Sequence, residues 1–170
     1  MKRLYLLRSA RHRASNQSSL ADYHRPLTKR GEIAAAAMGL AMRKNNYLPD
    51  LVICAAPART RLTLANIWPS LCGAEGKPPE LLYDFRIHLM RGDAMAARVR
   101  EVDEKFASVL IIGIVPGISD LARLLRQPND GEPDPFVLDL PIGNLAIFEC
   151  SNKTWAEMAP GCGVLMKLVS

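Results

Sequence analysis

Three short segments of the sequence carry residues that could bind a phosphate group. Arg8 and Ser9 close the first apolar run, Arg59 and Arg61 follow the second, and residues 113–117 close the run at 108–114 and lead into a helix. Guanidinium groups fork onto phosphate oxygens, and the N–H groups at a helix start favour anions. If the three segments meet, they form a phosphate pocket. The alternative is that Arg59 and Arg61 are solvent-facing residues in the first turn of a helix.

The elements that must position these segments follow from hydrophobic periodicity. Continuous apolar runs predict strands at residues 3–8, 51–55, 81–85, 108–114, 145–150 and 163–169. Helical spacing predicts helices at residues 28–45, 59–71, 93–106 and 119–126. Thr28 can cap the first of these helices. The apolar face of that helix, which we expect to be buried, contains Ile33, Ala37, Leu40 and Ala41.

The order of these elements predicts the fold class. Strands and helices alternate, which is typical of an α/β protein with a mostly parallel sheet, here a three-layer sandwich with helices on both faces. The final two strands suggest an antiparallel edge. No repeat or linker interrupts the chain, so we expect one domain over residues 1–170. In such sheets ligands bind at the carboxyl ends of the strands, where the three anion-binding segments would lie.

Composition narrows the possible function classes. The chain has 170 residues, of which 49% are hydrophobic and 23% charged, the balance of a soluble globular protein. No apolar run approaches the roughly 18 residues that a membrane span needs. No export signal is evident, so we expect a cytoplasmic protein with reduced thiols. The four cysteines lack metal-ligand spacing, and no metal site is expected. The net charge of +5 leaves a phosphorylated ligand, nucleic acid and an anionic membrane surface open as partners.

Several ordered segments resemble the histidine phosphatase superfamily, specifically its SixA-type phosphohistidine phosphatase branch. LYLLRSA at residues 4–10 is similar to that branch's LYLLRHA, and HRPLTKRG at 24–31 to its DRPLTKRG. CAAPARTRLT at 54–63 resembles CSPAxRTRxT, and IGIVPGISDLARLL at 112–125 resembles VGHNPGLSDLARLL. The ending, with TWAEMAPGCG at 154–163, also follows that branch. The resemblance spans residues 2–168.

The resemblance implies a fold, a reaction and a set of site residues. Members use a histidine after the first strand as nucleophile, form a phosphohistidine intermediate, and need no metal or organic cofactor. Two arginines and a second histidine surround the phosphate. Carried over to this sequence, the two arginines are Arg8 and Arg59. The nucleophile position holds Ser9 and the second histidine position holds Ile114, so both histidines are replaced.

These replacements predict a phosphatase-like protein that is catalytically impaired or inactive. A serine hydroxyl is a weak nucleophile without a base to activate it, and an isoleucine side chain can neither donate a hydrogen bond nor carry charge. The two arginines should still bind phosphate. The expected partner is therefore phosphate, or a signalling protein bearing phosphohistidine, held by a pseudophosphatase. Asp22 and Asp84 could act as acids near the pocket but are interpreted as surface residues.

Two alternatives remain open on the sequence alone. The protein could be an active phosphohistidine phosphatase with a relocated nucleophile, for which His12 is the first candidate and His24 and His88 are others. It could instead be a nucleic-acid-binding module, but aromatic residues make up only 6% of the chain and no nucleic-acid-binding motif is present. We therefore expect neither nucleic acid nor membrane as a partner. The sequence leaves the oligomeric state undetermined.

Overall fold

A six-stranded mixed sheet forms the centre of the computed structural model, which describes residues 1–14, 22–73, 76–126 and 139–170. The strands are ordered β3-β2-β4-β1-β5-β6. Their bounds are β1 Lys2–Arg8, β2 Leu51–Ala55, β3 Glu80–Asp84, β4 Ser108–Gly113, β5 Leu145–Cys150 and β6 Gly163–Val169. The first four strands are parallel to one another. Strand β5 runs antiparallel to both β1 and β6, which confirms the predicted antiparallel edge.

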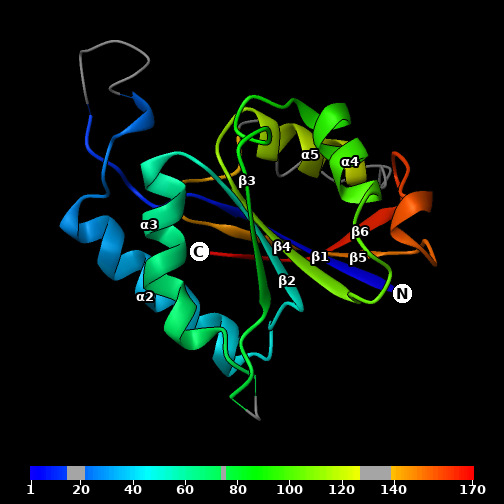
Figure 1. The fold of residues 1–170 in the computed structure, drawn as a ribbon, viewed down its shortest axis with the longest axis horizontal. Coiled ribbons are helices and arrows are strands. Elements are labelled where there is room, and N and C mark those ends of the chain that lie inside the picture. Colours follow the sequence, from blue (N-terminus) through cyan, green and yellow to red (C-terminus); the bar gives the residue numbers. More distant parts are fainter. Residues whose placement is uncertain (15–21, 74–75, 127–138) are drawn as a thin grey trace.

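Helices cover both faces of this sheet (Figure 1). Helices α2 (Lys29–Lys44) and α3 (Ala58–Ile67) pack together on one face, and α4 (Gly92–Arg100) and α5 (Gly117–Leu125) pack together on the other. Short 3-10 turns lie at Trp68–Ser70 and Trp155–Glu157. The described residues therefore form the predicted α/β three-layer arrangement. None of their helices is long and apolar enough to cross a membrane.

Alternation along β1 builds a hydrophobic core on each side of the sheet. Leu4 and Leu6 belong to the core beneath α4 and α5, whereas Tyr5 and Leu7 belong to the core beneath α2 and α3. All four side chains are buried. A strand that is apolar on both faces must be central in the sheet, and β1 lies between β4 and β5. This central position fixes the place of Arg8 at its carboxyl end.

The predicted buried face of α2 is wrong. Ile33 and Leu40 are both 63% exposed. The buried positions are instead Gly31, Ala35, Met38, Gly39 and Met42. Small residues on this face bring the helix close to its neighbours: a Cβ added at Gly31 would lie 2.0 Å from the Arg11 carbonyl oxygen. Large apolar side chains identified the wrong face because close packing here requires small ones.

The predicted surface position of Asp84 is also wrong. This residue ends β3, is only 5% exposed, and accepts hydrogen bonds from Arg86 and Arg98. Burial alone would raise the pKa of its carboxyl, but the two arginines outweigh burial and hold that pKa far below its usual range. Asp84 therefore links the edge strand to α4 as a permanently charged structural group.

Candidate functional site

Arg8 and Ser9 lie where β1 ends beside β4. The register pairs Arg8 with Gly113, the Ser9 N–H donates to the Gly113 carbonyl at 3.0 Å, and the Gly143 N–H donates to the Ser9 carbonyl at 3.2 Å. Ser9 is 4% exposed. The structure thus brings together two of the three predicted anion-binding segments, and it holds the Ser9 backbone from both sides.

Arg59 comes from the start of α3, directly after β2. It is 7% exposed, and its Nη1 donates to both the carboxylate and the carbonyl oxygen of Asp22 at 3.1 Å. The alternative of a solvent-facing arginine is therefore wrong for Arg59. It holds for Arg61, which is exposed on the same helix. Asp22, interpreted from the sequence as a surface residue, is half-buried and orients Arg59.

The two arginines are close enough for their charges to interact. Burial lowers the pKa of Arg8; Asp139 opposes this effect, and the positive charge of Arg59 adds to it. The Arg8 Nη1 donates to the Leu140 carbonyl at 2.7 Å, and no carboxylate of the described residues forms an ion pair with Arg8. Two partly desolvated cations that repel each other form a site that an anion would stabilise.

Ile114 follows β4 and is half-buried, at the turn that leads into α5. Its carbonyl accepts the Ile118 N–H at 3.1 Å, which closes the turn. Ser119, in the first turn of the helix, accepts the Leu140 N–H through its hydroxyl at 3.0 Å. Because the Leu140 carbonyl binds Arg8, α5 and the Arg8 side chain are connected through one backbone residue. The Ile114 side chain is hydrocarbon and cannot donate a hydrogen bond.

A hydroxyl that sequence reasoning did not identify orders the segment after Ser9. Thr63, on α3, accepts the Ala10 N–H at 2.9 Å and donates to the Arg59 carbonyl at 2.7 Å. The threonine ties the segment that follows β1 to the helix that carries Arg59. The RTRxT spacing from Arg59 to Thr63 places both residues one turn apart, so this contact had a sequence signal. No sequence pattern points to the Leu140 carbonyl as the partner of Arg8, because every residue has a backbone carbonyl.

His12 lies near Arg59, and its backbone forms an isolated antiparallel β-bridge with Leu27. The Thr28 N–H donates to the Arg11 carbonyl at 3.0 Å, which holds this segment against the start of α2. Burial lowers the pKa of the half-buried His12 ring, and the positive charges of Arg59 and Arg25 lower it further. The lowered pKa favours the neutral form of the His12 ring, which lies close to Arg59.

The other two histidines pack against an aromatic ring. Tyr23 contacts His24 and His88 edge-on, at 5.2 and 5.8 Å between ring centroids. The His88 Nδ1 also lies 2.7 Å from the Phe85 carbonyl oxygen. Both imidazole rings thus contact the Tyr23 ring, and His88 also contacts the segment that follows β3.

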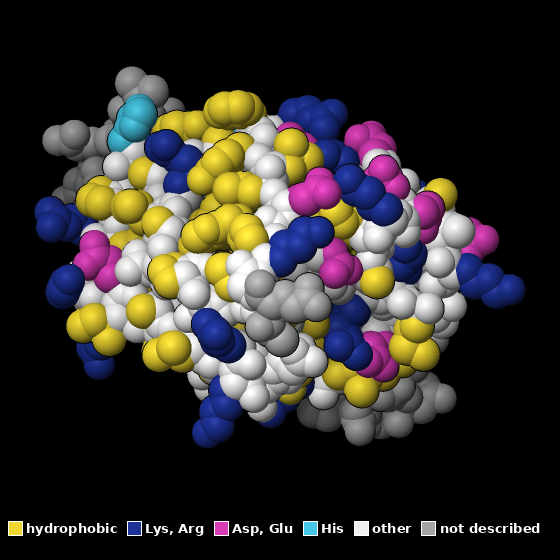
Figure 2. Space-filling model, turned by 60° about the horizontal axis from the view of Figure 1, so that its bottom comes forward, with side chains coloured by type: hydrophobic (Ala, Val, Ile, Leu, Met, Phe, Trp, Pro, Cys, Tyr) yellow, Lys and Arg dark blue, Asp and Glu magenta, His cyan; other side chains and the backbone are white. Residues whose placement is uncertain are grey.

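An apolar groove of about 550 Å³ lies next to these aromatic residues. It is lined by Tyr23, Ala56, Arg61, Tyr83 and Phe85. Tyr23 directly follows Asp22, whose carboxylate binds Arg59, so the groove lies next to Arg59. Figure 2 shows hydrophobic side chains gathered in a patch on one face of the molecule. The large exposed apolar residues along β3 and just after it are Leu81, Leu82, Tyr83, Phe85 and Leu89.

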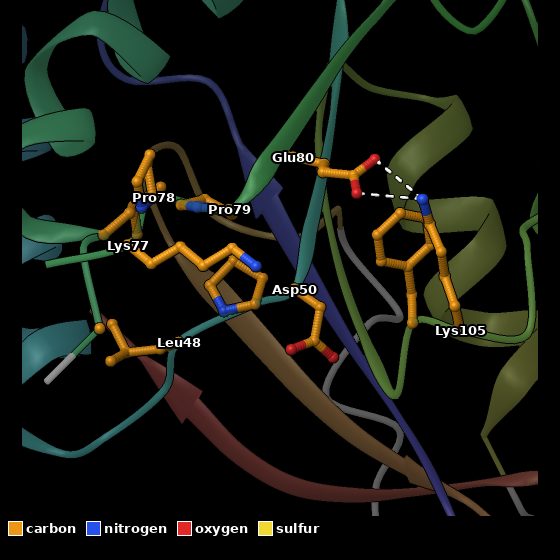
Figure 3. Close-up of a pocket in the computed structure, with 11 residues that line it drawn as sticks. Leu48, Asp50, Lys77, Pro78, Pro79, Glu80 and Lys105 are labelled. Carbon is orange, nitrogen blue, oxygen red and sulfur yellow. Dashed lines mark hydrogen bonds and ion pairs between the residues drawn. The ribbon is translucent and has the colours of Figure 1, made fainter. Parts of the chain in front are cut away.

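A second pocket, of about 390 Å³, lies at the opposite end of β2 and β3 (Figure 3). Its charged residues already have partners: Lys105 pairs with Glu80 at 3.0 Å, and the Asp50 carboxylate accepts the Ala107 and Ser108 N–H groups. The dashed lines in Figure 3 join the Lys105 ammonium to both carboxylate oxygens of Glu80. Lys105, Glu80 and Asp50 are therefore engaged in contacts within the fold. Among the described residues, no group of three His, Cys, Asp or Glu side chains could hold a metal ion.

Comparisons with known proteins agree with this fold. No protein-family model matches the chain. A protein from Nakamurella multipartitia, assigned as a phosphohistidine phosphatase SixA, superimposes with a TM-score of 0.81 and 26% identity over 99% of this chain and 95% of its own. Its counterpart from Agrobacterium tumefaciens gives a TM-score of 0.77 and 20% identity over 99% of this chain and 97% of its own. An uncharacterized protein of Mycobacterium tuberculosis is 25% identical over 150 residues, 86% of this chain and 89% of its own. The predicted fold and resemblance are thereby confirmed.

Proposed function

We propose that this chain, whose fold is that of the SixA-type histidine phosphatases, binds phosphorylated proteins and hydrolyses their phosphate poorly or not at all. The observation that carries the proposal is one juxtaposition. Arg8 and Arg59 come together at the carboxyl ends of β1 and β2, and by the sequence resemblance Ser9 and Ile114 occupy the positions of the family's two histidines. The arginines supply the means to bind phosphate, and the two replacements remove the means to cleave it.

Phosphate binding follows from the charge of the site. A phosphate between Arg8 and Arg59 would relieve their mutual repulsion and accept charge-assisted hydrogen bonds from both guanidinium groups. Asp22 orients Arg59 through one nitrogen, Nη1, which leaves its other nitrogens available. The Leu140 carbonyl takes Nη1 of Arg8 in the same way. Each arginine is therefore held in place by one edge of its fork while the rest can bind a ligand.

Hydrolysis lacks two of its components. No hydrogen bond joins the Ser9 hydroxyl to a His, Asp or Glu side chain within the described ranges, so nothing there activates it. In a well-studied protease, loss of the nucleophile costs on the order of 10⁶ in rate, and loss of one donor to the transition state costs roughly 10²–10³. Either loss would leave little of the family reaction.

The partner that fits best is a protein rather than a free metabolite. The apolar groove of Tyr23, Tyr83 and Phe85 adjoins the arginines and exposes more aromatic surface than a phosphate ion needs. An exposed apolar patch beside a polar site is typical of a protein-interaction surface. With the family resemblance, this favours a phosphohistidine-bearing signalling protein in the cytoplasm as the ligand.

A second candidate function rests on His12. Its ring is held neutral beside Arg59, and neutral imidazole is the nucleophilic form. If the ring reaches the phosphate, the protein is an active phosphohistidine phosphatase with a relocated nucleophile. Loss of measurable wild-type activity in His12→Ala would support this function, and unchanged activity would exclude it.

The proposal is tested by titrating inorganic phosphate calorimetrically and by assaying turnover of a phosphohistidine peptide and an aryl phosphate. Arg8→Ala and Arg59→Ala should each weaken phosphate binding by about 10- to 100-fold, the value of a charge-assisted hydrogen bond. Arg61→Ala is the matched control, since Arg61 is exposed on the helix that carries Arg59, and it should change binding less than about twofold. Equal effects of all three variants would contradict the phosphate site. Turnover within tenfold of an active relative would contradict the loss of hydrolysis.

A further inference from the structure

We propose that Cys150 and Cys162 form a reversible oxidation site, in which a hydroperoxide converts the two thiols into a disulfide. Both cysteines are free thiols. This site lies at the end of the sheet opposite Arg8, because the register pairs Cys150 with Lys2 at the start of β1. The inference is therefore independent of the proposed phosphate binding.

Cys150 is the last residue of β5, and Cys162 directly precedes the neighbouring strand β6. Cys150 ends β5 and is paired in antiparallel register with Gly163, the residue directly after Cys162. The Ser151 N–H donates to the Cys162 carbonyl at 2.9 Å, which fixes the two backbones side by side. Both side chains belong to the same hydrophobic core, on one face of the sheet. The Ser151–Cys162 hydrogen bond, one residue beyond the Cys150–Gly163 pair, holds the two backbones at the spacing of paired strands, which allows the short Cα separation that a disulfide requires.

The two thiols also differ in the way that a reactive pair requires. A hydrogen bond from the Cys150 thiol lowers the pKa of Cys162 against the opposing effect of burial, and the charge of Arg100 adds to the lowering. The same contact, together with burial, raises the pKa of Cys150. Cys162 is 9% exposed and Cys150 is fully buried. Cys162 is therefore the more exposed sulfur and the one with the lowered pKa, so an oxidant would reach it before Cys150.

The reaction balances with a hydroperoxide as the oxidant. The Cys162 thiolate attacks the peroxide oxygen, the O–O bond breaks, and a sulfenic acid forms at Cys162 as hydroxide leaves. The Cys150 sulfur then attacks the Cys162 sulfur, the S–O bond breaks, and the thiol proton leaves with the hydroxyl group as water. Two electrons pass from the two sulfurs to the peroxide. A dithiol reductant reverses the step by exchange.

The cross-link would close the segment that carries Trp155. The Trp155 Nε1 donates to the Phe106 carbonyl at 2.8 Å, and the Lys2 ammonium lies 5.2 Å from the centre of the indole ring. Oxidation would tie this segment to β5 and should raise the thermal midpoint of unfolding. It should leave the affinity for inorganic phosphate unchanged, since Arg8 and Arg59 lie at the other end of the sheet.

The test is intact-mass and peptide mapping of the full chain after treatment with stoichiometric hydrogen peroxide, denaturation and alkylation. We expect the wild type to lose two of its four alkylatable thiols, with a disulfide-linked peptide pair that contains Cys150 and Cys162. Dithiothreitol should restore all four. Four alkylated thiols after oxidation, or a linked pair that involves Cys72, would overturn the proposal.

Variants assign the order of events. Cys150→Ser should accumulate a sulfenic acid at Cys162 that dimedone traps, whereas Cys162→Ser should remain unmodified. Cys54→Ser is the matched control, because Cys54 is buried with a pKa raised to about 12, and this variant should form the disulfide as the wild type does. Sulfenic acid at Cys150 in the Cys162→Ser variant would contradict the assigned roles. If a variant does not fold, the wild-type peptide map still decides the proposal.

Discussion

The two ends of β1 each hold a desolvated cation, and the two cations have opposite surroundings. Lys2 is buried at the start of the strand, where its ammonium pairs with the Glu104 carboxylate at 2.9 Å and donates to the Phe106 carbonyl. Arg8 ends the strand half-buried, with one carbonyl partner and the charge of Arg59 against it. Lys2 is neutralised within the protein, and Arg8 is not.

This difference separates a structural charge from a ligand-binding charge. A buried cation with its own carboxylate contributes to folding and has nothing left to offer a ligand. A cation held against another cation costs folding free energy, which is typical of a functional site. The comparison therefore assigns opposite consequences to removal of the two charges.

The strongest way to sharpen the comparison is to give the Arg8 end the groups that it lacks. The double variant Ser9→His, Ile114→His should raise hydrolysis of a phosphohistidine peptide by on the order of 10²-fold or more, because nucleophile and donor losses each exceed that value. Released phosphate measures the effect. The single variants are the controls, and each should gain less than the pair. No gain in the pair would mean that the two replacements do not limit the reaction.

Removal of the two cations tests the comparison directly. Arg8→Ala should weaken phosphate binding by about 10- to 100-fold with little loss of stability. Lys2→Met should leave phosphate binding unchanged and lower the free energy of unfolding by about 1–3 kcal/mol, because the Phe106 carbonyl loses its charged donor. Calorimetric titration measures the phosphate affinity of each variant, and chemical denaturation measures its free energy of unfolding. A Lys2→Met variant that loses phosphate affinity would break the comparison.

A milder change asks whether the shape of the guanidinium matters as well as its charge. Arg59→Lys retains the charge but loses the fork that binds Asp22 and phosphate together, so we expect phosphate affinity to fall by about five- to tenfold. Arg61→Lys is the matched control on the same helix and should bind phosphate normally. Equal affinity in Arg59→Lys and wild type would show that Arg59 acts as a point charge only.

The smallest expected effect is the titration of His12, followed by NMR. Burial, Arg59 and Arg25 lower its pKa, so the unfolded chain binds this proton more readily than the folded protein. Stability should therefore be complete above about pH 6.5 and fall as the pH drops through the window below it. Bound phosphate should raise the pKa of His12 by offsetting the two arginines. An unchanged pKa on phosphate binding would separate His12 from the site.

The sequence alone predicts the six strands, and it predicts that Arg8 and Arg59 follow the ends of two of them, because each of these features depends on a local pattern. Apolar runs bounded by breakers define β1, β2 and β4, and the arginines come directly after such runs. The buried face of α2 could not be predicted, since Gly31 and its small neighbours are buried by close approach to another segment rather than by their own hydrophobicity. The large apolar residues of α2, Ile33 and Leu40, lie on its exposed face.

Long-range polar partners were beyond prediction for a different reason. Asp22 lies 37 residues from Arg59, and Leu140 lies 132 residues from Arg8. The first contact depends on where the chain places Asp22 in space, and the second uses a backbone carbonyl that any residue would supply. Asp84 has the same character, since its burial depends on Arg98 from another element.

One measurement tests the central claim, that the site binds phosphate without cleaving it. A phosphohistidine-bearing peptide is mixed with an equimolar amount of the protein and followed by phosphorus NMR. We predict that the phosphohistidine signal shifts or broadens with the wild type, not with Arg8→Ala, and that no inorganic phosphate appears beyond its spontaneous rate of release. Rapid release of inorganic phosphate by the wild type, or an unshifted signal, would contradict the claim.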